Sequence, residues 1–488
     1  MKQAWHIFQK DFRHLWPALL GWFLTAAFLF TWQPMEFFPD YRRVNVLGGD
    51  FVFFAAFVSW LAIVAQVVHH EALPGTTQFW LARPYDWRSL LGAKLLFGLL
   101  CLHLPLLVLD LACLARNGLS PLASLPQLLD RHLLLFPFLC VLPAAAAALT
   151  RNLAQFALVA VLGSAAMSIG VAMLLAPDRY FGRLSWVPSF ASLGVLITAA
   201  AVVVYLQYSK RPHRLGQVLA VTGLTGAILI AALVPWSTAT AVQRSLSPAN
   251  GKNLQMRIAG PREPYKENQV RPGFVRVRVP LRVEGLGDRD LVSDRLTVRI
   301  GDWESSSQEN MRLDRKDMHD FAQRFELPVD VYRRHQHEPV RLVSKAFVST
   351  YVRVADATVP FGVTADVPGV GVCDSREQQG DRPGISTVAV ACRVPPSERE
   401  RILVRAEKTG EPLDFWLTLA GGSLSPAGMT VSIAPVQMRR TSFSGPRTDP
   451  TGLLFRRMRL EASFRVEWTF DQFKLSDYVT WEPDQGRR

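Results

Sequence analysis

Seven long apolar runs fill the first half of the chain, and they constrain its fold more than any other feature. Each run approaches the ~20 residues that an α-helix needs to cross the hydrocarbon core of a bilayer. The runs lie near positions 15–32, 51–68, 90–114, 133–149, 153–175, 187–206 and 215–235. The sequence therefore predicts a polytopic α-helical membrane domain of about seven spans over residues 15–236.

Charge density rises sharply after this region. Residues 1–240 contain 16 Lys+Arg and 9 Asp+Glu, whereas residues 241–488 contain 38 and 32. The formal net charge is +13, but no basic run is long enough to follow a phosphate backbone, so nucleic acid is not an expected partner. The basic residues of the first half lie instead at the ends of apolar runs, which indicates membrane topology.

The distribution of these basic residues predicts the orientation. With the N-terminus inside, the cytoplasmic segments hold ten Lys+Arg, against six on the other side, and short basic loops are retained in the cytoplasm. An odd number of spans then places residues 237–488 outside the cytoplasm. We expect a multi-pass protein of the bacterial inner (plasma) membrane with a periplasmic C-terminal domain.

The first 14 residues have the pattern of an amphipathic helix. Trp5, Phe8 and Phe12 recur at helical spacing between basic residues, which predicts a helix in the membrane interface before the first span. The alternative is the positive flank of a signal anchor. Lys94, at the end of a later run, is expected to extend to the lipid headgroups.

Residues 237–488 have the pattern of a β-rich domain. Val275, Val277, Val279, Leu281 and Val283 alternate with Arg276, Arg278, Pro280 and Arg282, as in a strand with one buried face. Similar stretches occur near 296–300, 340–354, 387–394, 402–406, 415–419, 429–436 and 464–468. Many short strands over about 250 residues favour one or two β-sandwich modules.

Two further features of this domain can be checked. Residues 316–325 suggest the only helix of the β-rich part. Cys373 and Cys392 could form a disulfide if the domain faces an oxidising compartment. No metal site is expected.

A polar, basic and aromatic segment, residues 69–94, separates the second and third runs. Gly75 and Pro84 divide it into a turn, a short amphipathic piece and the beginning of the next helix. His69, His70 and Glu71 begin a zinc-protease motif, but Pro74 stands where the second ligand would be, so a metal site is disfavoured.

Part of this segment carries a family resemblance. The run Phe79-Trp80-Leu81-Ala82-Arg83-Pro84, followed by Trp87-Arg88 and Ala93-Lys94-Leu95-Leu96, resembles the loop between spans two and three of type 2 ABC (ATP-binding cassette) transporter permeases. The resemblance covers roughly residues 1–235. It implies a coupling loop on which an ATPase subunit docks, through Glu71, Phe79, Trp80, Arg83 and Arg88.

The same resemblance implies a function. The chain would be the permease subunit of an ATP-driven exporter, paired with itself or with a second permease and surrounded by lipid. No Gly-x-x-x-x-Gly-Lys-Ser/Thr loop occurs in the sequence, so we expect no enzymatic activity here, with ATP and Mg²⁺ bound by the separate ATPase. The family has six spans and both ends inside, so the seventh span and the outer domain are departures.

Two alternatives remain open. Phe79 and Trp80 could belong to the interfacial aromatic belt, and the chain could be a non-transporting anchor that displays a β-sandwich binding domain. Within the third run, His103 and Asp110 are about two helical turns apart and could line a transport path. Asp110 could instead pair with Arg116 or Arg131.

Overall fold

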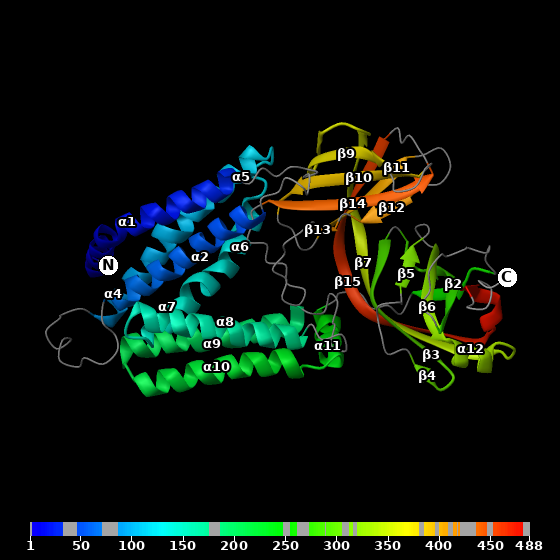
Figure 1. Cartoon of the computed structure of the whole chain (residues 1–488), viewed down its shortest axis with the longest axis horizontal. Helices are drawn as coiled ribbons and strands as arrows, with labels where there is room; N and C mark the ends of the chain where they lie inside the picture. Colours follow the sequence, from blue (N-terminus) through cyan, green and yellow to red (C-terminus); the bar gives the residue numbers. More distant parts are fainter. Residues whose placement is uncertain are drawn as a thin grey trace.

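The computed structural model describes residues 2–32, 46–70, 86–174, 186–246, 254–260, 273–287, 289–304, 312–315, 320–379, 385–395, 400–407, 413–416, 418–419, 436–446 and 452–481. A group of long helices occupies one side of the molecule and a β-rich region the other, as Figure 1 shows. The change from helix to strand falls after residue 246, close to the predicted boundary.

All of the predicted apolar runs coincide with helices where the chain is described. Five of them form the uninterrupted helices α1 (Lys2–Trp32), α2 (Val46–His69), α8 (Leu153–Leu174), α9 (Trp186–Ser209) and α10 (His213–Leu233). A short helix, α11 (Trp236–Leu246), then leads toward the β-rich region.

The other two runs form helices that contain a wide π-helical turn. The first comprises α4 (Trp87–Phe97), η1 (Gly98–His103) and α5 (Leu104–Arg116), and the second comprises α6 (Leu125–Phe136), η2 (Pro137–Val141) and α7 (Leu142–Ala148). Each π turn ends two residues before a proline, Pro105 or Pro143. A proline in a helix lacks the amide donor, and its ring clashes with the carbonyl four residues earlier, which accounts for the altered turn.

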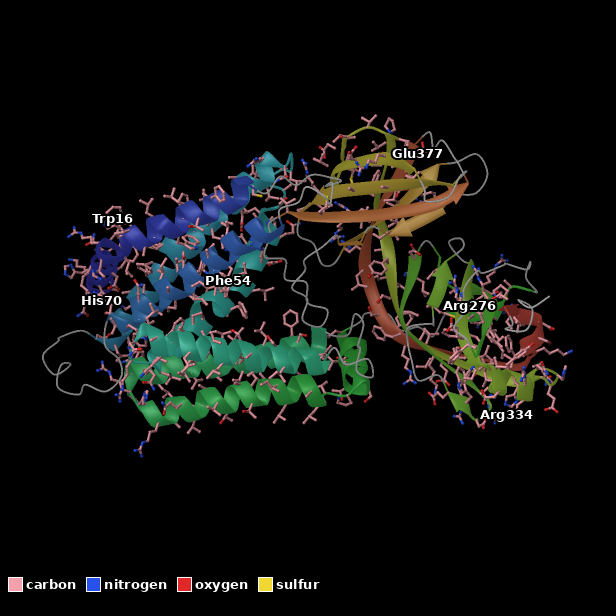
Figure 2. All side chains as sticks on the ribbon, in the orientation of Figure 1. Trp16, Phe54, His70, Arg276, Arg334 and Glu377 are labelled. Carbon is pink, nitrogen blue, oxygen red and sulfur yellow. A yellow bond between two sulfur atoms is a disulfide. The ribbon has the colours of Figure 1, made fainter. Side chains whose placement is uncertain are left out.

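Within the described residues, four helices are long and apolar enough to cross a bilayer: Trp87–Arg116, Leu125–Ala148, Val187–Ser209 and His213–Leu233. Phe54–His69 and Leu153–Ala166 are shorter apolar helical stretches. Large apolar side chains such as Trp16 and Phe54 are exposed on α1 and α2 (Figure 2), as expected of a surface that faces lipid. The count of seven spans stays a prediction.

Residues 2–32 form one helix that includes Pro17. The segment predicted to lie in the interface therefore continues into the first apolar run without a break. One face of α1 packs into the core of the helical region through Ile7, Phe8, Leu15, Leu19 and Trp22, and the Trp22 ring meets Trp60 of α2 edge to face at 5.0 Å.

The described residues of the β-rich region form three antiparallel sheets. Their strands are β1 (Gln255–Ile258), β2 (Phe274–Glu284), β3 (Arg289–Ile300), β4 (Trp303–Glu304), β5 (Arg312–Arg315), β6 (Asp320–Pro328), β7 (Val340–Pro360), β8 (Ala365–Val367), β9 (Gly371–Gln379), β10 (Ile385–Val394), β11 (Glu400–Glu407), β12 (Leu413–Trp416), β13 (Thr418–Leu419), β14 (Gln437–Pro446), β15 (Gly452–Phe473) and β16 (Val479–Trp481). The sheet orders are β1-β2-β6-β5 with β16 on β2, β13-β14-β10-β9-β8, and β12-β11-β15-β7-β3-β4.

Two long strands, β7 and β15, organise the region into two modules. They pair along nearly their whole length, and Figure 1 shows them running from one module into the other. One end of their sheet, with β3, encloses a core with the β1-β2-β6-β5 sheet, and the other end, with β11, encloses a core with β9 and β10. The region therefore consists of two sheet-on-sheet cores that share one sheet.

The predicted strands are confirmed where the chain is described. The helix predicted over residues 316–325 is wrong in its described part, because residues 320–325 belong to β6, and α12 (Val329–His335) follows this strand. The reason is a period-2 pattern, since Gln323, Phe325 and Leu327 alternate into the core. The stretch near 429–436 lies outside the described residues apart from Val436.

The helical and β-rich regions meet at two places. After α5, Gly118 adopts a positive φ of 76° and ends the helix, and a Cβ at this position would approach Val372 of β9 to 3.0 Å. Leu119 and Leu128 share an apolar cluster with Val436. At the second place, Val187 of α9 and Ala239 of α11 pack on Phe347 of β7.

Candidate functional site

Six Asp, Lys, Arg and His side chains are buried in the helices that the structure describes. Exposed fractions are 1% for Asp11, 9% for Lys94, 6% for His103, 0% for Asp110, 6% for Arg131 and 8% for His132. Burying such groups is costly unless they are paired. They form two clusters, which we call the Asp11 cluster and the histidine network.

The Asp11 cluster joins three helices. Lys94 of α4 donates from Nζ to Oδ2 of Asp11 in α1, at 2.7 Å. Nδ1 of His70, directly after α2, lies 3.9 Å from the other oxygen, Oδ1, and the His70 ring lies 4.6 Å from that of His14. Burial lowers the pKa of His70 below its usual 6.5, which favours the neutral ring.

This geometry corrects the prediction for Lys94. Its side chain does not extend to the headgroups, because it is buried and neutralised by Asp11. A buried cation is tolerated when a hydrogen-bonded counter-charge lies beside it. The sequence pattern indicated a lysine at a helix end but did not identify its partner, 83 positions away.

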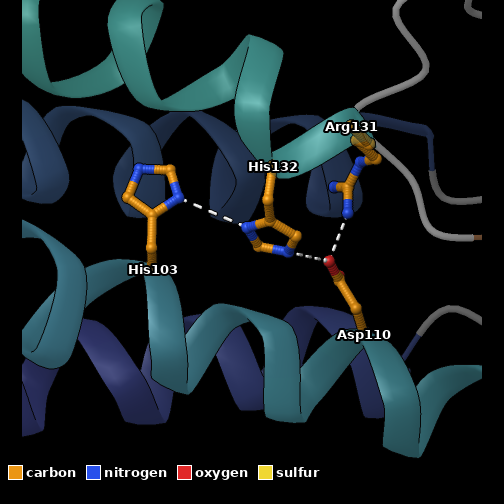
Figure 3. A network of polar contacts seen from close by, with 4 residues as sticks. All are labelled: His103, Asp110, Arg131 and His132. Carbon is orange, nitrogen blue, oxygen red and sulfur yellow. Dashed lines mark hydrogen bonds and ion pairs between the residues drawn. The ribbon is translucent and has the colours of Figure 1, made fainter. Parts of the chain in front are cut away.

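The histidine network joins α5, η1 and α6, and Figure 3 shows its four side chains converging. Arg131 and His132 of α6 both donate to Oδ2 of Asp110, His132 from Nε2 at 3.0 Å. Nδ1 of His132 faces Nδ1 of His103 at 3.3 Å. His103, the last residue of the π turn, is thus linked to Asp110 through His132.

The partners assign the histidine tautomers. Arg131 forms an ion pair with Oδ2 of Asp110, so His132 carries its proton on Nε2 and donates it to the same oxygen. If His132 is neutral, its Nδ1 is an acceptor, and His103 must donate from Nδ1. His103 Nε2 is then an acceptor buried without a hydrogen-bond partner among the described residues, as is Oδ1 of Asp110.

Aromatic rings close the network on the His103 side. The Trp60 ring meets the His103 ring edge to face at 5.2 Å, and the Phe136 ring lies 5.1 Å away. Trp60 Nε1 is held in place by donating to the Leu139 carbonyl. No group of three His, Cys, Asp or Glu side chains that could hold a metal ion occurs in the part of the chain that the structure describes.

The two residues predicted to line a transport path therefore lie close together and are buried. His103 and Asp110 belong to one buried network, and Asp110 is paired with Arg131, one of the two arginines considered from the sequence. His132 was not singled out from the sequence. The only sequence feature that marks it is its place next to Arg131 at the beginning of an apolar run.

Of the predicted docking residues, Glu71, Phe79, Trp80 and Arg83 lie outside the described residues. Arg88 is exposed in the first turn of α4, with its guanidinium 5.5 Å from the Trp87 ring centre. Trp87 itself packs edge to face on Tyr205 of α9.

The predicted interface residues divide into two groups. Trp5 and Phe12 are exposed, whereas Phe8 is buried in the helical core and stacks on Trp5. Phe8 therefore packs between helices.

Cys373 and Cys392 are opposite each other on β9 and β10 and form a disulfide. It lies in the core of the module that contacts the connection after α5. Cys101, Cys113 and Cys140 are free and buried.

No protein-family model matches this chain, and no curated protein sequence is significantly similar to it.

Proposed function

We propose that the chain is the membrane-spanning permease subunit of an ATP-driven ABC transporter, an exporter powered by a separate ATPase subunit. In this proposal the seven apolar helices are spans, the N-terminus is cytoplasmic and the β-rich region is periplasmic. Docking takes place on residues 71–88, and a second copy or a similar permease completes the transporter.

The Asp11 cluster is the observation that carries this proposal. The proposed docking segment begins after His70 and continues into α4, and both flanks converge on one buried carboxylate of α1. Displacement of the segment by a partner would therefore act on α1, α2 and α4 together. Such a junction suits a subunit whose helices respond to a cytoplasmic motor, because transporters switch by rigid-body movement of helix groups.

The contacts of the β-rich region support the same proposal. This region packs on the connection after α5 and also on α9 and α11, so it bridges separate parts of the helical region. Rearrangement of the helices would change these contacts. The Cys373–Cys392 disulfide fits an oxidising compartment outside the cytoplasm.

A second candidate is a membrane anchor that displays the β-rich region as a binding domain. The histidine network favours this second candidate. His103 and Asp110 are both buried and both contact His132, so their side chains are not exposed to a transport path. In a membrane anchor, the buried ion pairs would serve only to hold the helices in fixed positions relative to one another.

Affinity purification of the tagged full-length chain in mild detergent, followed by mass spectrometry, tests the proposal. We expect a nucleotide-binding subunit to co-purify, and its recovery to fall several-fold for Phe79→Ala/Trp80→Ala. Trp16→Ala is the matched control, because it removes an exposed aromatic from α1. Absence of an ATPase subunit, or equal recovery with all variants, would favour the anchor.

A further inference from the structure

We propose that His103, His132 and Asp110 form a buried proton-binding relay, which takes up one proton at His103 and stores it on His132 beside Asp110. The inference goes beyond the proposed function and does not depend on an ATPase partner. It rests on the order of the three groups in space and on the unsatisfied acceptor at its end.

The transfer balances atom by atom. A proton binds Nε2 of His103, and the proton on Nδ1 of His103 moves across the 3.3 Å contact to Nδ1 of His132. His103 ends neutral, with its proton now on Nε2. His132 becomes an imidazolium that still donates from Nε2 to Oδ2 of Asp110, so the network gains one proton and one positive charge.

Two unsatisfied atoms favour proton uptake. A buried acceptor without a hydrogen bond loses its hydration and gains no partner in return, and His103 Nε2 is such an atom among the described residues. Protonation turns it into an N–H in a ring whose centre lies 5.2 Å from that of Trp60 and 5.1 Å from that of Phe136. Asp110 Oδ1, also without a hydrogen-bond partner there, is an additional acceptor near the stored charge.

The surroundings limit uptake to one proton. Arg131 already neutralises Asp110, so a second protonation would place two uncompensated charges in an apolar interior. α2 faces His103 with the indole of Trp60, and α6 does so with the Phe136 ring. Cys113 and Arg116 follow Asp110 on α5, three and six residues further along.

The position of the relay connects it to the rest of the molecule. Trp60 and Leu102, at the His103 end, belong to the main helical core. Cys113 follows Asp110 on α5, and Leu128 precedes Arg131 on α6. Both belong to the cluster that includes Val436 of the β-rich region. A proton stored on His132 would therefore add one positive charge between these two clusters, the helical core and the cluster that contacts the β-rich region.

¹⁵N NMR of the histidine-labelled full-length chain in lipid nanodiscs tests the relay. Ring nitrogen shifts distinguish the two neutral tautomers from the imidazolium. From about pH 8 to about pH 5, we expect His132 to become an imidazolium while His103 stays neutral and moves its proton from Nδ1 to Nε2. A ¹⁵N–¹⁵N correlation across the Nδ1···Nδ1 contact assigns both rings in the wild-type chain, so this readout needs no variant.

Substitution gives an independent measurement. His103→Gln can donate to His132 but cannot pass on a proton, so proton uptake over this range should fall by about one proton per chain. His337→Gln, which removes an exposed histidine, should leave the ring nitrogen signals of His103 and His132 and their change between the two pH values unchanged. The proposal is overturned if His103 and His132 titrate independently, if His103 keeps one tautomer throughout, or if neither ring changes state.

Discussion

Asp11 and Lys94, 83 positions apart in the sequence, meet in a buried ion pair that holds α1 against α4. Both are almost fully removed from solvent, so each neutralises a charge that the apolar helices would otherwise have to bury alone. His70 approaches the second oxygen of the same carboxylate. Lys94, in the last turn of α4, thus binds the carboxylate of α1 beside which the His70 ring lies at the end of α2.

Removing one member of this pair should destabilise the helical region strongly. Loss of one partner leaves the other charge buried, which costs about 3–5 kcal/mol. We expect Lys94→Met and Asp11→Leu to lower the Tm of the purified chain in detergent markedly, and the double variant to recover most of the loss. Lys2→Met, at an exposed position of α1, is the control; if the double variant were no more stable than the singles, the pair would not be coupled.

The close packing of α9 and α10 should depend on Gly223. A Cβ at this position would collide with the Cβ of Ala199, and overpacking costs about 1–3 kcal/mol. Gly223→Ala should therefore lower the Tm. Gly194→Ala is the matched control on α9, because a Cβ there meets nothing within 4 Å; equal effects of the two variants would contradict the observed helix packing.

The Cys373–Cys392 disulfide should form in the cell and stabilise its module. Alkylation of the denatured chain with and without prior reduction should show two additional reactive thiols after reduction. Cys373→Ala/Cys392→Ala should destabilise the module by about 2–4 kcal/mol. Detection of both thiols in the unreduced chain would argue against an oxidising compartment, and therefore against the proposed periplasmic location.

The proposed orientation can be tested at two exposed turns. Leu122, 82% exposed between α5 and α6, should face outward, whereas Arg151, exposed between α7 and α8, should face the cytoplasm. In intact cells, a membrane-impermeant thiol reagent should label Leu122→Cys directly and Arg151→Cys only after permeabilisation. The reverse pattern would invert the topology.

Periodicity explains which elements the sequence could predict. The apolar runs and the alternation from Val275 to Val283 determine helix and strand locally, and both are found as expected. The helix predicted to end at Phe325 is wrong, because Gln323, Phe325 and Leu327 face the core from a strand, and the polar Gln323 hides this alternation in the sequence. The shared sheet of β7 and β15 could not be predicted, since pairing such as Phe464 with Val348 joins residues far apart in the chain.

The candidate site shows the same limit. His103 and Asp110 were identifiable because ionisable residues within an apolar run are unusual. Their partners on α6 follow from the helix packing, which sequence spacing does not specify. The Asp11–Lys94 pair also depends on a long-range contact, and its two charges looked like ordinary flanks of apolar runs.

The most direct test of the central proposal is ATP hydrolysis by the complex that co-purifies with the tagged chain. The sequence contains no Gly-x-x-x-x-Gly-Lys-Ser/Thr loop, and our proposal assigns hydrolysis to a separate subunit. We predict vanadate-sensitive ATPase activity with the wild-type chain and with Trp16→Ala, and its loss with Phe79→Ala/Trp80→Ala. Hydrolysis that is absent, or unaffected by the Phe79 and Trp80 substitutions, would contradict the proposal that an ATPase drives this protein through that segment.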